Sequence, residues 1–287
     1  MTVTLTTNQV ATPQDKTYDT SLLPERDVAF IEKAQPVLEA YASYFAPEVR
    51  GFDNLPADGP MLLVGNHSGA STPPDLPILF TRWWRERGID DPIYGLFHSF
   101  FINLPGIGKY VRRAGAIEAG HEAAERVLRN GGNLVVFPGG DHEVFRPWSE
   151  RNQIDFAGRT GFIKLALRTG VPIVPVVSCG AHETSIVLSR GEKLLKFMPH
   201  LRLMRVKVSP IVLGPPFGIS LGMPTLPLPA KITVQLCKPI DLTALGFGPD
   251  DAENPEVLAE CYKAVTTSMQ ATLDQLAAEG TSGLFAR

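Results

Sequence analysis

An apolar run that changes abruptly into small and polar residues constrains this chain more than any other feature. Residues 61–64, Met-Leu-Leu-Val, have the length and composition of a buried strand, and Gly65 bounds the run. The polar residues that follow at once include His67. Ligands of α/β proteins usually bind at the carboxyl ends of buried strands. We therefore expect His67 at that edge of a sheet, within reach of a ligand.

His67 and Asp75 are candidates for an acid–base pair. Imidazole suits proton transfer near neutral pH, and a carboxylate can orient the ring. On one continuous helix the two residues would stand about 12 Å apart at 1.5 Å per residue, and Pro73 and Pro74 exclude such a helix. The pair therefore requires that residues 67–72 form a loop that folds back on Asp75.

A structural role for Asp75 is the alternative. Thr72 would cap a helix, Pro73 would be its first residue, and Asp75 would be an acidic residue of the first turn. The two roles are compatible, because the first turn of a helix can also present a carboxylate to a neighbouring loop.

The remaining chain alternates between strand and helix patterns, which predicts an α/β fold. We expect a single domain over residues 49–287, with a largely parallel central sheet flanked by helices. Residues 1–20 are predicted to be a disordered polar tail and residues 21–48 a helical segment, which Pro36 should kink or split. Further strands are predicted at 92–97, 133–137, 171–177, 205–213 and 231–237, and helices at 73–87, 121–130, 159–167 and from 255 onward. The prolines of the strand at 171–177 favour one unpaired side.

Composition excludes several classes of protein. A net charge of -3 lacks the basic excess of a general nucleic-acid binder. The three cysteines are widely spaced, which indicates a reducing compartment and neither a disulfide framework nor a zinc site. The sequence shows no secretory signal, and its longest uncharged run, residues 208–230, is interrupted by prolines. We expect a cytoplasmic protein, either soluble or peripherally attached to the inner face of the cell membrane.

Residues 61–75 resemble the first motif of the glycerolipid and lysophospholipid acyltransferase family, in which four residues separate a His from an Asp. Here Thr72 occupies the place of that Asp, and Asp75 is the nearest one. The spelling Asn-His-Ser-Gly followed by Pro-Pro-Asp is similar to a subgroup near the monoacylglycerol and diacylglycerol acyltransferases. The resemblance implies an enzyme that moves a fatty acyl group from acyl-CoA or acyl carrier protein to a lipid hydroxyl. It implies His67 as general base, Asp75 as its partner, and no cofactor or metal beyond the thioester co-substrate.

Three later segments resemble further motifs of that family. Arg113 stands where the second motif places an Arg that contacts acceptor or donor, and its guanidinium could bind a phosphate or an ester head group. A surface cation is the alternative. Residues 171–177 match the fourth motif, whose role is mostly to shape the site. His182, just beyond it, is a second conceivable acid–base group.

The third motif is altered in spelling. Residues 138–142 read Pro-Gly-Gly-Asp-His, where the usual spelling is Pro-Glu-Gly-Thr-Arg. The backbone N–H groups of Gly139 and Gly140 can still approach an oxyanion, and Arg146 could supply the missing charge. The change favours a neutral or bulkier acceptor. Metal ligation by Asp141, His142 and Glu143 is disfavoured, because neighbouring side chains on a strand point in opposite directions.

Membrane contact and two rival functions stay open at this point. The N-terminal helices or the proline-rich insert at 208–230 would touch lipid, or else pack on the domain. The first rival is a lipid hydrolase of the same fold, against which the absence of a Gly-x-Ser-x-Gly elbow counts. The second is a lipid-binding module without catalysis.

Overall fold

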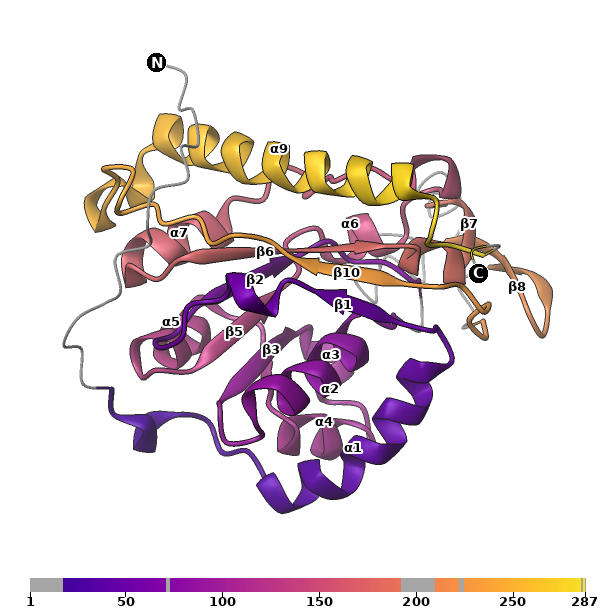
Figure 1. The fold of residues 1–287 in the computed structure, drawn as a ribbon, viewed down its shortest axis with the longest axis horizontal. Helices are drawn as coiled ribbons and strands as arrows, with labels where there is room; N and C mark the ends of the chain where they lie inside the picture. Colours follow the sequence, from indigo (N-terminus) through magenta and orange to yellow (C-terminus); the bar gives the residue numbers. More distant parts are fainter. Residues whose placement is uncertain (1–17, 71–72, 192–209, 222–224, 285, 287) are drawn as a thin grey trace.

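A seven-stranded sheet forms the centre of the molecule, and helices cover both of its faces (Figure 1). The structure is a computed structural model that describes residues 18–70, 73–191, 210–221, 225–284 and 286. The strand order is β1-β10-β6-β2-β5-β3-β4, and every neighbouring pair is parallel except β10 with β6. The predicted α/β fold with a largely parallel sheet is therefore confirmed. The strands are β1 (Glu48–Arg50), β2 (Leu62–Gly65), β3 (Ile93–Phe97), β4 (Ala116–Glu118), β5 (Asn133–Val136), β6 (Ile173–Cys179) and β10 (Thr233–Leu236).

The helices follow the strands along the chain in the alternation that the sequence predicts. The α-helices are α1 (Val28–Ser43), α2 (Asp75–Arg87), α3 (Ser99–Ile102), α4 (Gly108–Arg113), α5 (His121–Arg129), α6 (Gly140–Val144), α7 (Gly161–Thr169) and α9 (Pro255–Glu279). Short 3-10 turns are η1 (Thr20–Leu22), η2 (Phe52–Asn54), η3 (Trp148–Glu150), η4 (Ala181–Thr184) and η6 (Pro249–Glu253). No helix in the described part of the chain is long and apolar enough to cross a bilayer.

Two apolar cores hold the layers together, one on each face of the central sheet. Strand β2 contributes to both, because its side chains alternate: Leu62 and Val64 face one core, and Leu63 faces the other. The first core receives α5, α7 and the inward stripe of α9, and the second receives α1 and α2. A strand that is buried on both faces explains why residues 61–64 are continuously apolar.

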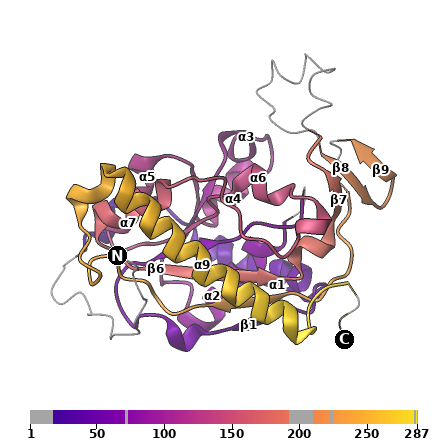
Figure 2. The same ribbon diagram turned by 90° about the horizontal axis from the view of Figure 1, so that it is seen from above.

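A second, smaller sheet stands at the carboxyl end of β6. It is antiparallel, in the order β7-β8-β9, with β7 (Ile186–Ser189), β8 (Ile211–Gly214) and β9 (Gly218–Leu221). Figure 2 shows β8 and β9 at the margin of the molecule, beyond the end of β6. The apolar insert at 208–230 therefore builds a β-hairpin within its described part, and residues 205–209 of the strand predicted at 205–213 lie outside the described residues.

Several local predictions need correction. Pro36 does not split its helix: α1 is one α-helix, capped by Asp27, whose carboxylate accepts the Phe30 N–H at 2.8 Å. Burial of Ile31 and Ala42 against α2 outweighs the lost backbone bond. The short edge strand β1 was not predicted, since three half-buried residues carry no clear pattern.

The fourth-motif strand is also paired on both sides, contrary to the prediction. β6 lies between β2 and β10. Pro175 pairs with Val64 of β2, and its carbonyl accepts the Cys237 N–H at 2.9 Å, just past the end of β10. Pro175 has no backbone N–H to donate, but it stands where the pairing of β6 with β10 ends. The sheet therefore accommodates this proline.

Candidate functional site

The side chain of Asn66 fixes the start of the loop that carries His67, because its amide forms the hydrogen bonds that a further strand residue would form. Asn66 is buried, its Nδ2 donates to the Ser178 carbonyl at 2.9 Å, and its Oδ1 accepts the Ser178 N–H at 2.7 Å. These two bonds extend the pairing of β2 with β6 beyond the end of β2. His67 therefore starts its loop from a defined point at the carboxyl edge of the sheet.

The loop then reverses its direction through Gly69. The φ of Gly69 is +94°, and a Cβ there would lie 2.6 Å from Cδ of Pro74, so a side chain does not fit. Asp75 lies in the first turn of α2, as the alternative expected, but the predicted start of the helix at Pro73 was wrong, because Pro74 is the N-cap and Asp75 the first helical residue. Thr72 lies outside the described residues. The chain folds back as the long spacing between His67 and Asp75 requires.

The structure brings the imidazole of His67 and the carboxylate of Asp75 together. His67 Nδ1 is 3.1 Å from Asp75 Oδ2, and the same oxygen accepts the Ser68 N–H at 2.9 Å. The Asp75 side chain is 4% exposed and that of His67 is 18% exposed. The ring stacks on Phe137 at a centroid distance of 4.4 Å. With Nδ1 bound to the carboxylate, Nε2 is the ring nitrogen left to exchange a proton with a substrate.

The third motif reaches the same loop through Glu143, a residue to which the sequence analysis gave no catalytic part. Glu143 Oε2 accepts the backbone N–H of His67 at 3.0 Å. Its Oε1 accepts from Arg146 Nη1 at 3.2 Å, and neither side chain of this pair has any exposed surface. The only sequence signal was an acidic residue within the third motif, four positions after Gly139.

Burial raises the pKa of Glu143 to about 7, while the neighbouring Arg146 and the bond from the His67 N–H act in the opposite direction. The carboxyl group that holds the backbone of His67 therefore changes protonation near neutral pH.

Arg146 has an interior position, which differs from the expectation that its charge would reach an acceptor. Besides its pair with Glu143, its Nη2 donates to the Arg151 carbonyl at 3.4 Å, and its own carbonyl accepts from His182 Nε2 at 2.6 Å. A fully enclosed guanidinium cannot contact a bound phosphate directly. We infer that Arg146 acts through Glu143.

His182 is buried as well and is unsuited to acid–base work near neutral pH. Burial and the nearby Arg146 lower the pKa of His182 to about 3, so the ring is neutral. Its donated bond to the Arg146 carbonyl gives it a structural part beneath the His67 loop.

Arg113 is held by α1 rather than by the His67 loop. Its guanidinium donates to Asp27 Oδ2 at 2.7 and 3.0 Å and lies 4.2 Å from the ring centroid of Phe30. Its contact with a substrate stays a prediction.

A different cation, Arg159, lies on the glycine loop of the third motif. Arg159 Nη1 donates to the carbonyls of Pro138 and Gly139 at 3.1 and 2.8 Å, and Nη2 pairs with Asp141 at 2.8 Å. Its side chain is 42% exposed. Sequence reasoning missed it because it is far from the motif along the chain and becomes a neighbour only through the packing of α7.

The acidic cluster of the third motif is helical, so the strand argument against a metal there was wrong. Residues Asp141 to Glu143 lie in α6, and His142 Nε2 is 2.7 Å from Asp155 Oδ2. Within the described ranges, no group of three or more His, Cys, Asp or Glu side chains is arranged to hold a metal ion.

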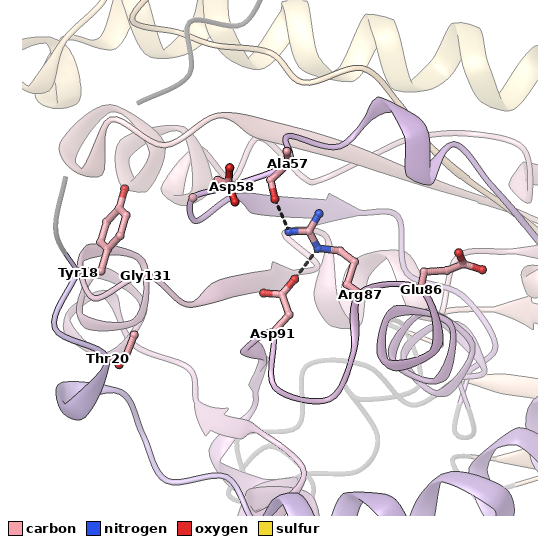
Figure 3. A pocket seen from close by; sticks show the side chains of 9 residues that line it. Tyr18, Thr20, Ala57, Asp58, Glu86, Arg87, Asp91 and Gly131 are labelled. Carbon is pink, nitrogen blue, oxygen red and sulfur yellow. Dashed lines mark hydrogen bonds and ion pairs between the residues drawn. The ribbon is translucent and has the colours of Figure 1, made fainter. Parts of the chain in front are cut away.

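Two surface pockets lie away from His67. One, of about 500 Å³, is lined by Asp58, Arg87 and Asp91 among others, and Figure 3 shows Arg87 bound to Asp91 and to the Ala57 carbonyl. Gly59 and Gly131 place this pocket at the amino ends of β2 and β5, opposite to the edge that carries His67. The other, of about 280 Å³, lies between α1 and α2. No predicted site residue lines either pocket.

The chain is similar to one family model and to several known proteins. Residues 46–179 match the family model described as Acyltransferase. An uncharacterised protein of Mycobacterium tuberculosis is 32% identical over 238 residues, which are 83% of this chain and 63% of that protein. The human "DGAT1/2-independent enzyme synthesizing storage lipids" is 26% identical over 190 residues, 66% of this chain and 56% of that protein. The chain thus spans less than two thirds of the length of these curated relatives.

A solved structure shares the fold. The 1-acyl-sn-glycerophosphate acyltransferase PlsC of Thermotoga maritima superposes with a TM-score of 0.51 at 18% identity, covering 90% of this chain and 86% of that one.

The buried Glu143–Arg146 pair is expected to be strongly coupled. At a pH of about 8, where the Glu143 carboxyl is mostly ionised, Glu143→Gln and Arg146→Met should each destabilise the fold by about 3–5 kcal/mol, because each leaves the other group buried without its partner. The double variant should cost clearly less than the sum of the two. Chemical denaturation of the four proteins measures the coupling.

The matched control is the half-exposed pair of Arg82 and Glu86, at 2.7 Å on α2. A double-mutant cycle on this pair should give a coupling energy of about 0.3–0.5 kcal/mol. Strict additivity of the Glu143 and Arg146 substitutions would contradict the interpretation.

The same carboxyl group should make stability depend on pH. The pKa of Glu143 in the folded protein, about 7, lies above its ordinary value of 4.5. The folded state therefore binds this proton more tightly, and the associated stability is complete below pH 4.5 and is lost as pH rises through 7. The free energy of unfolding of the wild type should fall relative to that of Glu143→Gln over this interval. A difference that is flat with pH, measured by urea denaturation, would show that Glu143 stays ionised throughout.

Proposed function

Because the chain belongs to the acyltransferase family through residues 46–179, we propose that it transfers a fatty acyl group from an acyl thioester to a hydroxyl of a glycerolipid or lysophospholipid. The observation that carries the proposal is the contact of 3.1 Å between His67 Nδ1 and Asp75 Oδ2 at the carboxyl edge of the sheet. The donor is acyl-CoA or acyl carrier protein.

The proposed reaction is a direct transfer with His67 as general base. His67 Nε2 removes the proton of the acceptor hydroxyl while that oxygen attacks the thioester carbonyl. The C–S bond then breaks, the acyl group stays on the new ester oxygen, and the imidazolium returns its proton to the leaving thiolate. Asp75 holds the ring through Nδ1 and stabilises its charged form. Such a base contributes about 10²–10⁴-fold to a rate.

The structure narrows the choice of oxyanion donors. The candidates are the backbone N–H groups of two adjacent pairs, Ser68 with Gly69 and Gly139 with Gly140. That of Ser68 is bound to Asp75, and that of Gly140 is bound to the Phe137 carbonyl at 3.1 Å. Gly69 and Gly139 are therefore the better candidates for binding the developing negative charge.

A neutral glycerolipid fits the site better than a phosphorylated acceptor. His142 replaces the arginine of the resembled motif and bonds to Asp155, while Arg146 is enclosed. The name of the human relative, which mentions storage lipids, supports the same acceptor class. The resembled family as a whole also serves phospholipid biosynthesis. We place the reaction at the inner face of the cell membrane, with the protein attached peripherally.

Replacement of the proposed base tests the function directly. His67→Ala should lower acceptor-dependent thiol release from acyl-CoA by about 10²–10⁴-fold, because no group remains to take the hydroxyl proton. Asp75→Asn should retain the shape but also lower the rate, since the amide bears no charge to stabilise the imidazolium. Release is followed with and without monoacylglycerol or a lysolipid, and the assay is repeated with acyl carrier protein.

His121→Ala is the matched control, because His121 is an exposed histidine at the start of α5. It should leave the rate unchanged, and circular dichroism should show all variants folded. Thiol release that does not depend on an acceptor would favour hydrolysis. Folded wild-type protein that releases no thiol from either donor would favour a binding module.

A further inference from the structure

The small sheet β7-β8-β9 turns apolar side chains toward solvent. Its inner row consists of Val187, Val212 and Ser220, which are paired across the three strands and are at most 4% exposed. On β9 the serine is therefore buried, while its neighbours Ile219 and Leu221 are 65% and 50% exposed. A strand that faces water normally shows the reverse pattern.

The exposed apolar residues form one continuous face because of the strand register. Ile219 of β9 stands opposite Leu213 of β8, and Leu221 stands opposite Ile211. Phe217, in the turn between β8 and β9, is 61% exposed. We call this the apolar face; its large exposed members are Leu213, Ile219 and Leu221 on the strands and Phe217 in the turn. Scattered apolar residues are ordinary on a surface, whereas a contiguous group indicates a binding partner.

The apolar face is attached to the loop that carries His67. The inner valines of β7 and β8 pack on Ala70, which follows Gly69 in that loop. Ser185, just before β7, donates through its hydroxyl to the Gly69 carbonyl at 3.3 Å. Figure 2 shows the small sheet at one margin of the molecule.

Charge in the adjoining sequence indicates an anionic partner. The chain between Gly191 and Pro210 joins β7 to β8 and lies outside the described residues. Its sequence contains one acidic residue, Glu192, and five basic ones. The basic residues are Lys193, Lys196, Arg202, Arg205 and Lys207. Basic residues in a segment that is joined along the chain to an apolar surface favour attraction to anionic lipid head groups. The proposed surface itself comprises described residues only.

We propose that the apolar face inserts into the surface of an anionic lipid bilayer and so presents the His67 loop to the membrane. The inference rests on the proposed function in one respect: the acceptor alcohol is a lipid that resides in the bilayer. A face joined to the catalytic loop lets the acceptor reach His67 from the membrane. Helix α1 is a weaker candidate, because its most exposed apolar residue, Val37, stands on a helix whose polar positions include Glu32 and Glu39.

Vesicle flotation of the full chain tests the proposal. Wild-type protein should float with vesicles of phosphatidylcholine and phosphatidylglycerol, and more weakly with phosphatidylcholine alone. The double variant Ile219→Asp and Leu221→Asp should lose about tenfold or more of its partition, because two exposed apolar side chains are replaced by charges. Both positions face solvent, so the fold should be retained.

The matched control changes two equally exposed aliphatic residues elsewhere. Leu22→Asp with Val37→Asp alters residues that are 56% and 71% exposed and gives the same change in net charge. The control should float like the wild type. Equal flotation of the two double variants, or loss in the control alone, would overturn the assignment of the apolar face.

Two other occupants of the face would also overturn the proposal. If a second copy covers it, sedimentation should show wild-type dimers that the β9 variant converts to monomers, without vesicle binding. If residues 192–209 cover it, wild-type protein should float only after that segment is replaced by a short glycine–serine linker.

Activity separates this proposal from the proposed function. The β9 variant should transfer acyl groups to a detergent-dispersed acceptor at the wild-type rate and lose activity only on vesicle-embedded acceptor. Flotation itself needs no turnover. Wild-type protein that floats as expected but transfers nothing would therefore overturn the proposed function while supporting the docking surface.

Discussion

The hydrogen bond from the backbone N–H of His67 to a carboxylate that water cannot reach is the constraint on which this site depends. Glu143 contributes that carboxylate from α6, and Arg146 compensates its charge within the same buried space. A buried polar group without a hydrogen-bond partner destabilises the folded state. The Glu143–Arg146 pair and the His67 loop therefore stabilise each other's positions. With Asn66 bonded to Ser178, the backbone directly after the end of β2 is fixed before a substrate arrives.

The sequence predicted the fold and the central pair because both depend on local signals. Continuous apolar runs mark strands that are buried on both faces, and the two prolines before Asp75 left a folded-back loop as the only way to join it to His67. The sequence did not predict the parts of Glu143 and Arg159, because their partners are chosen by packing between distant segments. Arg146 was predicted to supply the charge missing from the third motif, whereas the structure buries it completely beside Glu143.

The small sheet shows a different limit of sequence reasoning. Residues 208–230 could be recognised as apolar and rich in proline, yet apolar core and apolar surface have the same composition. Only the register decides between them, because a strand places alternate residues on opposite faces. On β9 the register buries Ser220 and exposes its two apolar neighbours.

The altered third motif can be understood from the space around Gly139. The resembled family has a glutamate at this position, where this chain has Gly139. A Cβ built at Gly139 would lie 2.5 Å from Glu143 Oε2, so the carboxylate of Glu143 occupies the place where a side chain at 139 would begin. Glycine at 139 therefore leaves room for that carboxylate. The acid of the altered motif lies one helical turn after Gly139 and holds the backbone of His67.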